Sequence, residues 1–302
     1  MQANPTLDQL QVFVTVAESG SFSAAARKLN RSQSVISYTI ANLEAQLELQ
    51  LFERGGTREP RLTETGKAML EDARRMVSVL QSLRSRVEGL KMGLEAEVAV
   101  AIDVSLPSPV MTCVLKAFQE QFPTVSLRVH VGALGMVWDL VLKKQADFGI
   151  AGPPLNAHDE LVLVQIGQTA MTPVAAPSHP LALYEGPVPL SFIRDHTQLV
   201  ITDLSEQTKG RNFGVFAYKI WRLTDVGTKY DLTVAGLGWG GLPKWMVNDD
   251  IAAGRLVQLD LEPYPETEYP LLAIYPVDRP LGPASNWLID RFKQELGRFG
   301  AD

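Results

Sequence analysis

The sequence predicts an α/β fold that begins with a separate helical domain. Apolar residues before residue 62 recur at helical spacing in three short segments. A heptad repeat of apolar residues follows them. From Glu95 onward, segments with strand alternation and segments with helical spacing take turns, which is the order of parallel α/β units.

Length and composition limit the classes of protein that fit. The 302 residues, 46% of them hydrophobic, suffice for two or three domains with cores of their own. No apolar run approaches the roughly 20 residues that span a bilayer, and the N-terminus lacks the basic start and apolar centre of a signal peptide. One cysteine and four scattered histidines offer neither a disulfide nor a metal site. We therefore expect a cytoplasmic protein with no membrane contact, metal or cofactor.

The first two helices are predicted from their ends and from one apolar stripe. Thr6 to Gln9 has the order of a capping box, with an acid in the first turn. Gly20 suits the end of this helix, and Ser21 can cap the short helix that follows. The stripe expected to be buried consists of Leu7, Leu10, Phe13, Val14 and Ala17.

The next helix has two contrasting faces. One carries apolar residues at spacings of four, three and four, namely Ile36, Ile40, Leu43 and Leu47. The opposite face carries small or hydrogen-bonding residues and no acid, namely Gln33, Ser34, Ser37, Tyr38 and Ala41. Ser32 is placed to cap the helix, and a turn-rich basic hairpin follows from Glu53 to Pro60. This order predicts a winged helix-turn-helix.

We expect this domain to bind double-stranded DNA, because uncharged polar side chains can reach base edges and cations can take phosphates. We assign the major groove to Gln33, Ser34, Ser37 and Tyr38. We assign phosphates or the minor groove to Arg31, Arg54 and Arg58. Residues 1 to 91 hold 12 Lys+Arg against 10 Asp+Glu, whereas the remainder holds 16 against 24. This asymmetry is typical of a DNA-binding N-terminal domain attached to an acidic remainder that avoids nonspecific DNA contact.

The run from Leu7 to Gly66 resembles the N-terminal domain of LysR-type transcriptional regulators. The matching residues are Phe13, Ala17 to Phe22, Ala25, Ala26, Leu29, Ser32, Gln33, Ser37, Leu43, Glu44, Leu47, Leu51 to Arg54, Leu62, Thr63 and Gly66. Two positions depart from the family pattern, Ser34 where proline is usual and Tyr38 where a basic residue is usual. The base preference at those positions therefore does not carry over from the family.

A long helix is predicted next, from Thr63 to Lys91. Its apolar residues repeat at heptad spacing, namely Met69, Ala73, Met76, Leu80, Leu83, Val87 and Leu90. One interpretation is a core helix packed on its own domain. The heptad and the resemblance favour a linker helix that forms a homodimer, with a homotetramer implied by the family. We expect boundaries of 1–62 for the winged domain, 63–92 for the linker and 93–302 for the rest.

Residues 93–302 resemble the effector-binding half of the same regulators, which is built like a periplasmic binding protein with two α/β lobes. The matching pieces include Phe122-Pro123, Pro180-Leu181, Val234 to Gly238, Leu242-Pro243 and Gly254 to Val257. The resemblance implies one lobe of residues 93–165 and 268–302 and a second of 166–267. The chain is expected to cross between them near Gln165 to Gly167 and near Pro263 to Glu268.

Candidate effector contacts follow the ends of predicted strands, where helix N-termini offer free N–H groups. By resemblance they are Ser105, Ala133, Thr202 and Trp239. Ser105 and Thr202 could equally be helix caps. Because an apolar run from Gly132 to Met136 follows the second strand, we expect a small organic effector, largely apolar or aromatic, with one anionic group.

The resemblance implies a bacterial transcription regulator that binds dyad-related promoter DNA, with RNA polymerase as a further partner. Two alternatives stay open: a small-molecule enzyme with an accessory DNA-binding domain, and a DNA-binding protein without a ligand. No catalytic Ser-His-Asp arrangement or carboxylate pair is evident, so an enzyme is not expected. Cys113 lacks the second cysteine of a redox pair and is expected to be a small buried residue.

Overall fold

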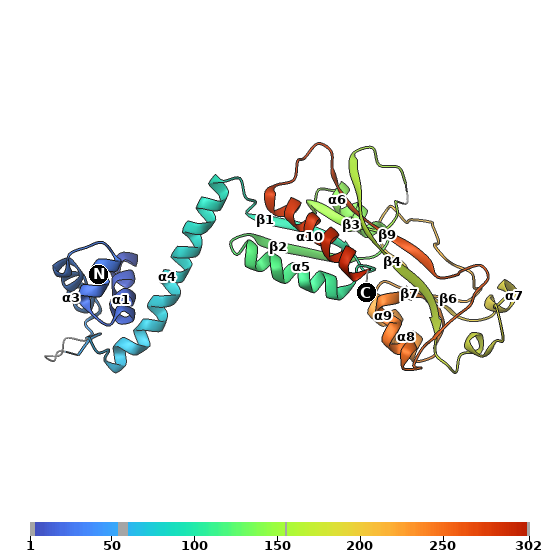
Figure 1. Ribbon diagram of the computed structural model, residues 1–302, viewed down its shortest axis with the longest axis horizontal. Coiled ribbons are helices and arrows are strands. Elements are labelled where there is room, and N and C mark those ends of the chain that lie inside the picture. Colours follow the sequence, from blue (N-terminus) through green and yellow to red (C-terminus); the bar gives the residue numbers. More distant parts are fainter. Residues whose placement is uncertain (1–3, 54–59, 155, 301–302) are drawn as a thin grey trace. The chain divides into compact units, whose positions relative to one another are not determined.

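A computed structural model describes residues 4–53, 60–154 and 156–300. The chain divides into two compact units, Met1–Gly89 and Leu90–Asp302 (Figure 1). Each unit has its own buried apolar clusters. Among the described residues, no helix combines the length and the apolar character needed to cross a membrane.

The first unit is helical and follows the sequence prediction closely. Its helices are α1 (Leu7–Ser19), α2 (Phe22–Lys28), α3 (Gln33–Leu47) and α4 (Glu64–Lys91), which ends just past this unit. Thr6 forms the predicted capping box with Gln9, and Gly20 ends α1 in the left-handed conformation (φ 66°). Leu7 is 45% exposed rather than buried, because it is the first residue of the helix and lies at the edge of the core.

The core of this unit joins the apolar faces of all four helices. Ile36, Ile40 and Leu43 of α3 pack with residues of α1, α2 and the start of α4. Gly66 lets α4 pass close to the backbone of residue 51, since a Cβ on Gly66 would lie 2.1 Å from the Leu51 carbonyl oxygen. The start of α4 therefore belongs to the winged domain, as Leu70 and Ala73 show by their burial.

The second unit alternates strands and helices. In chain order its elements are β1 (Glu97–Asp103), α5 (Ser108–Gln121), β2 (Ser126–Gly132), α6 (Gly135–Leu142), β3 (Phe148–Ala151), β4 (Leu161–Ala175), η1 (Pro180–Leu183), α7 (Leu190–Ile193), β5 (Gln198–Ile201), β6 (Ile220–Leu223), α8 (Val226–Val234), β7 (Gly240–Pro243), α9 (Lys244–Ala252), β8 (Val257–Gln258), β9 (Thr267–Pro276) and α10 (Pro283–Phe299). This is the predicted α/β fold class.

The main sheet is mixed rather than wholly parallel. Its strands run in the order β2-β1-β3-β9-β4-β7, with β8 paired to β4. β1 pairs in parallel with β2 and β3, as predicted, whereas β9 and β4 run antiparallel to their neighbours. The long strand β4 was not predicted, because Gly167, Pro173 and a bulge at Gln165 to Gly167 interrupt its alternation.

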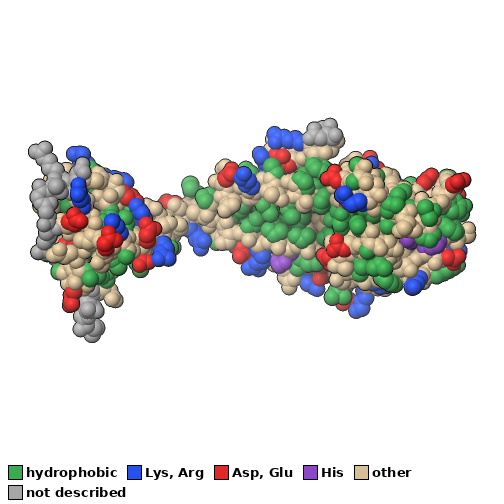
Figure 2. Space-filling view, turned by 90° about the horizontal axis from the view of Figure 1, so that it is seen from below, with side chains coloured by type: hydrophobic (Ala, Val, Ile, Leu, Met, Phe, Trp, Pro, Cys, Tyr) green, Lys and Arg blue, Asp and Glu red, His purple; other side chains and the backbone are tan. Residues whose placement is uncertain are grey.

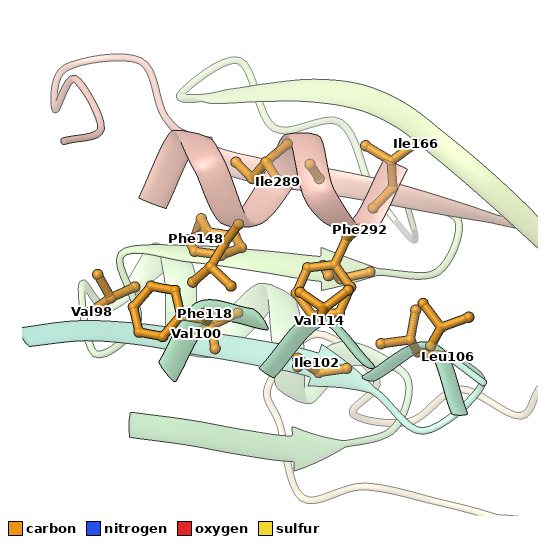
Figure 3. Close-up of a cluster of buried hydrophobic side chains, with 14 of the residues drawn as sticks. Val98, Val100, Ile102, Leu106, Val114, Phe118, Phe148, Ile166, Ile289 and Phe292 are labelled. Atoms are coloured by element: carbon orange, nitrogen blue, oxygen red, sulfur yellow. The ribbon is translucent and has the colours of Figure 1, made fainter. Parts of the chain in front are cut away.

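Helices cover both faces of the sheet at its β1 end. Alternate β1 residues Val98, Val100 and Ile102 pack against α5 and α10 (Figure 3). Ala101 faces the other way, toward Val137 and Trp138 of α6. A three-layer α/β/α arrangement results, and we call it the first lobe.

The second lobe has two separate apolar clusters, one around η1 and α7 and one around β7, α8 and α9. One contains Leu181, Ile193 and Trp239, and the other Leu242 and Val247. Strand β4 contributes to the cores of both lobes, with Ile166 in the first and Ala175 in the second, whereas Leu271 of β9 packs in the first. On the face of this unit visible in Figure 2, apolar side chains cover a broad area and charged ones lie mostly around it.

Candidate functional site

The polar face of α3 is exposed on the surface of the first unit. Ser32 caps the helix by accepting a hydrogen bond from the Val35 N–H at 3.3 Å. Gln33, Ser34, Ser37 and Tyr38 are all exposed, Tyr38 by 69%. The first turn of α3 contains no acid, and the last turn of α2 carries Arg27 and Lys28. An exposed helix face of this composition can enter a DNA groove without repelling phosphates.

Two of these side chains are already oriented by neighbours. The Ser23 hydroxyl of α2 donates to Gln33 Oε1 at 3.0 Å, which ties the start of α3 to α2. The hydroxyls of Ser32 and Ser34 lie 2.9 Å apart. Such contacts restrict the rotamers of the side chains expected to read bases, which would lower the entropy lost on binding.

Arg31 is held by an acid of α1. Its guanidinium donates to both carboxylate oxygens of Asp8, at 2.7 and 2.8 Å. The Arg31 hydrogen bond holds the pKa of Asp8 below its ordinary value. These bonds use two of the five N–H donors of the guanidinium, so Arg31 can face a phosphate while it stays paired.

The segment after α3 is positioned by a single carboxylate. Glu44 Oε1 accepts hydrogen bonds from the N–H groups of Leu51 and Phe52, at 2.7 and 3.1 Å. Phe52 then pairs with Leu62 in an antiparallel bridge. Arg54 and Arg58 lie outside the described residues. Glu44 thus fixes the base of the predicted wing, a positioning role that the sequence patterns did not reveal.

The second unit encloses a cavity of about 260 Å³ between its lobes. Its walls come from the end of β1, the turn before α6, strands β4, β5 and β7, helix α8 and the chain entering β9. The lining residues are Asp103, Val104, Ser105, Ala133, Leu134, Met171, Gln198, Leu199, Val200, Ile201, Phe213, Gly214, Val226, Lys229, Gly241, Pro243, Tyr264, Thr267, Glu268 and Tyr269. Most of these side chains are apolar.

The expected effector contacts divide into two pairs. Ser105 and Ala133 line the cavity, although the Ser105 hydroxyl donates to Asp103 Oδ1 at 2.6 Å. Thr202 and Trp239 do not line it. The Thr202 N–H donates to the Leu223 carbonyl, and Trp239 is fully buried in the core of the second lobe.

Asp103 is a buried acid in the cavity wall. Burial raises its pKa to about 6, against hydrogen bonds from Ser105 and the nearby backbone N–H groups of Gly152 and Leu134. Its Oδ2 has no hydrogen-bond partner of normal geometry among the described residues. Leu134 adopts φ 54° and ψ −122°, a backbone conformation that favours glycine and costs roughly 1–3 kcal/mol. The strain thus lies beside the buried carboxyl.

Lys229 of α8 is a buried cation in the same cavity. It is 6% exposed, and its ammonium donates to the Gly241 carbonyl of β7. Burial lowers its pKa to about 8, and among the described residues no acid forms an ion pair with it. The sequence patterns do not indicate Asp103 or Lys229, because each is buried by contacts with segments distant in the sequence, such as β7 at Lys229 and Gly152 at Asp103.

The lobes also touch beside the cavity. The Trp245 indole N–H of α9 donates to the Ser105 carbonyl at 2.9 Å. Gly135 at the start of α6 lies against the loop after β5, since a Cβ there would meet the Ser205 hydroxyl at 2.3 Å. These two contacts join α9 and the 203–208 loop to the first lobe, and one of them is made by Ser105, which also lines the cavity.

Two further expectations concern other side chains. Cys113 is exposed, so its assignment to the core was wrong. The buried stripe of α5 is Val110, Val114 and Phe118, and Cys113 lies about 100° around the helix from Val114. Among the described residues, no group of three or more His, Cys, Asp or Glu side chains could hold a metal ion.

Family comparisons agree with both halves of this geometry. Residues 7–67 match the family described as bacterial regulatory helix-turn-helix protein, lysR family. Residues 92–297 match the LysR substrate binding domain. The chain belongs to the LysR family.

Curated LysR-type relatives are named as transcriptional regulators. The chain is 29% identical over 258 residues to the uncharacterized HTH-type transcriptional regulator YeeY of Escherichia coli K12, covering 84% of this chain and 82% of YeeY. It is 28% identical over 294 residues to the HTH-type transcriptional regulator AceR of Acinetobacter baumannii, covering 97% and 98%. This LysR-family chain is thus a DNA-binding transcriptional regulator with an effector-binding domain.

Solved LysR-type structures share the fold. A Corynebacterium glutamicum OxyR C206 mutant matches with a TM-score of 0.54 at 22% identity, covering 99% of this chain and 96% of that one. Full-length LysG of the same organism, solved with bound effector Arg, matches with a TM-score of 0.52 at 19% identity, covering 96% and 98%.

Proposed function

We propose that this LysR-family regulator binds dyad-related promoter sites through α3 and a basic wing, and that a small organic effector in the inter-lobe cavity alters this binding. The exposed face over the first two turns of α3, which contain no acid, is the observation that supports the DNA contact most directly. Gln33, Ser34, Ser37 and Tyr38 face the major groove in this proposal. Arg31, Arg54 and Arg58 take phosphates or the minor groove.

The dimer is proposed to form along α4. Beyond its buried start, the heptad residues Met76, Leu83, Val87 and Leu90 are exposed by 41–56%. A stripe at heptad spacing on one helix is complementary to a second copy of itself. Two winged domains joined in this way would present two α3 helices to related half-sites. Association of dimers into tetramers is part of the same proposal.

The mass of the protein in solution tests the dimer. Leu83→Glu combined with Val87→Glu places charges in the proposed seam and should shift the mass toward the monomer in light scattering. Ser85→Glu, which lies on the opposite side of the helix, serves as the matched control and should leave the mass unchanged. A wild-type monomer at micromolar concentration would contradict the proposal.

The promoter function is tested by affinity capture of fragmented genomic DNA with the purified protein at about 150 mM salt, followed by sequencing. We expect a few fragments that contain inverted repeats. Uniform capture that vanishes with modest added salt would contradict sequence-specific regulation, and the cavity would then be assayed for substrate turnover. An effector chosen from the chemistry of the genes beside the captured fragments should change the DNase footprint on those fragments.

A further inference from the structure

The cavity of the second unit contains two buried opposite charges that do not neutralise each other. Lys229 comes from α8 in the second lobe, and Asp103 comes from the end of β1 in the first. Among the described residues, no ion pair joins them, and neither pairs with any other charged side chain. Unpaired charges inside a protein are costly, so they are usually paired or bind a ligand.

The local hydrogen bonds of these residues do not require charge. Asp103 Oδ1 accepts from the Ser105 N–H and hydroxyl, and the backbone N–H groups of Gly152 and Leu134 lie near the carboxylate, but all of these donors are uncharged. The Lys229 ammonium donates to one carbonyl, although an ammonium has three donors. Asp103 Oδ2 has no partner of normal geometry among the described residues. A purely structural role thus leaves the charges themselves unexplained.

We propose that the cavity binds a small amino carboxylate, whose carboxylate pairs with the Lys229 ammonium and whose amine donates to Asp103. The two buried charges sum to zero, which matches the net charge of a zwitterion, and the further lining acid, Glu268, is exposed. The apolar walls, including Val104, Leu199 and Phe213, surround the ligand's carbon skeleton. This deepens the earlier expectation of an apolar molecule with one anionic group by adding a cationic group at a defined place.

Ligand and lobe spacing are connected in this arrangement. Lys229 and Asp103 belong to different lobes, so one molecule that pairs with both holds the lobes at a fixed distance. Ser105 links Asp103 to the neighbouring contact, because its carbonyl accepts from Trp245 of α9. The ligand therefore borders the contact between Trp245 and Ser105 that joins the lobes.

Binding assays on the full-length protein test the ligand class. A panel of α-, β- and γ-amino acids is screened by thermal unfolding, and the strongest binder is then titrated by calorimetry. It is compared with two analogues of the same skeleton, the carboxylate without the amine and the amine without the carboxylate. Each analogue should bind at least about tenfold more weakly, because it leaves one buried charge unpaired.

Two variants assign each end of the ligand. Asp103→Asn should weaken the amino acid at least about tenfold and leave the carboxylate analogue unchanged. Lys229→Met should weaken the amino acid and the carboxylate analogue, and leave the amine analogue unchanged. Lys143→Met and Asp278→Asn, at exposed surface ion pairs, are the matched controls and should change nothing. If a variant folds poorly, the analogue pair on the wild-type protein carries the test.

Two results would overturn the proposal. One is a panel in which no amino carboxylate raises the unfolding temperature, and the other is a carboxylate analogue that binds as tightly as its amino acid. The ligand assignment rests on the regulator function proposed above, but DNA capture measures that function separately. Selective capture with a failed panel would refute the ligand class alone, whereas uniform capture would refute the regulator function.

Discussion

Asp103 shows at the scale of one residue how a binding site can reduce stability. Burial raises its pKa from 3.8 to about 6, so the ionised carboxylate is less stable in the folded protein than in the unfolded chain. The penalty is absent below about pH 4, grows as the pH rises toward 6, and then stays constant. At about 1.4 kcal/mol for each pKa unit, its size is roughly 1–3 kcal/mol at neutral pH.

Asp103→Asn should therefore stabilise the ligand-free protein at pH 7.5 by roughly 1–3 kcal/mol, and give no gain near pH 4. Thermal unfolding of both proteins at the two pH values measures this. The Asp278→Asn control, at an exposed position, should show no such gain at pH 7.5. A variant that is less stable than wild type at pH 7.5 would mean that the ionised carboxylate stabilises the fold.

Ser37 is the residue at which base reading by α3 can be tested. Its side chain is exposed, beside the buried stripe that contains Ile36 and Ile40. Ser37→Ala should reduce discrimination between captured operators, with a lost base contact costing roughly 1–3 kcal/mol. Arg58→Ala should instead weaken binding to all sequences and reduce the salt slope by about one unit. Equal loss of specificity in both variants would contradict the assigned roles.

At the scale of elements, α10 depends on an acid far away in the chain. The helix starts at Pro283 without a side-chain cap of its own. Glu95 supplies one, since its carboxylate oxygens accept from the N–H groups of Ala284 and Ser285, both at 3.0 Å. Burial opposes ionisation of Glu95, but these backbone hydrogen bonds outweigh it and lower the pKa.

Glu95→Gln should destabilise the second unit by about 1 kcal/mol at pH 7, as lost helix caps do. A carboxylate with a lowered pKa stabilises above its unfolded pKa, and the benefit is lost as the pH falls through the folded pKa. The difference between variant and wild type should therefore shrink toward pH 3 in thermal unfolding. Glu97→Gln, at an exposed ion pair with Arg128, should cost less at pH 7.

Elements could be predicted from the sequence where their signals are local. The caps at Thr6, Ser21 and Ser32 and the stripe of α3 depend on neighbours within one or two turns, and all were found as predicted. Strands β6 and β7 were missed, because β6 is largely exposed and Gly240 and Gly241 of β7 suggest a turn.

Of the two candidate sites, the sequence predicted the polar face of α3 but not the charged residues of the cavity, again because only local signals can be read from a sequence. The polar face of α3 is one stripe of one helix, and its periodicity shows it directly. The cavity is formed by segments that are far apart in the sequence, so the charges that matter there are recognised only once the lobes are assembled. In the sequence Lys229 resembles an ordinary surface lysine of α8, and only the fold shows that its side chain packs against Gly240 and Gly241 of β7.

At the scale of the whole molecule, the two units have separate cores and should unfold separately. Ile36 lies in the core of the first unit and Ile102 in that of the second, and both are almost fully buried. Removing one methylene by Ile→Val costs roughly 0.5–1.5 kcal/mol in either place. Because the residues share no cluster, the two effects should be independent and additive.

Calorimetry of the full-length protein should thus show two transitions. Ile36→Val should lower only the transition of the first unit, and Ile102→Val only that of the second. The shift should be larger in the smaller unit, because a given loss of free energy lowers Tm by about 4–8 °C per kcal/mol in domains of 60–100 residues and by about 2–4 °C in domains of 150–250. A single transition that both substitutions lower would mean that the units unfold cooperatively. If each substitution lowers only one transition, the two units unfold independently. Any coupling between effector binding and DNA binding then passes through the linker helix or through the oligomer.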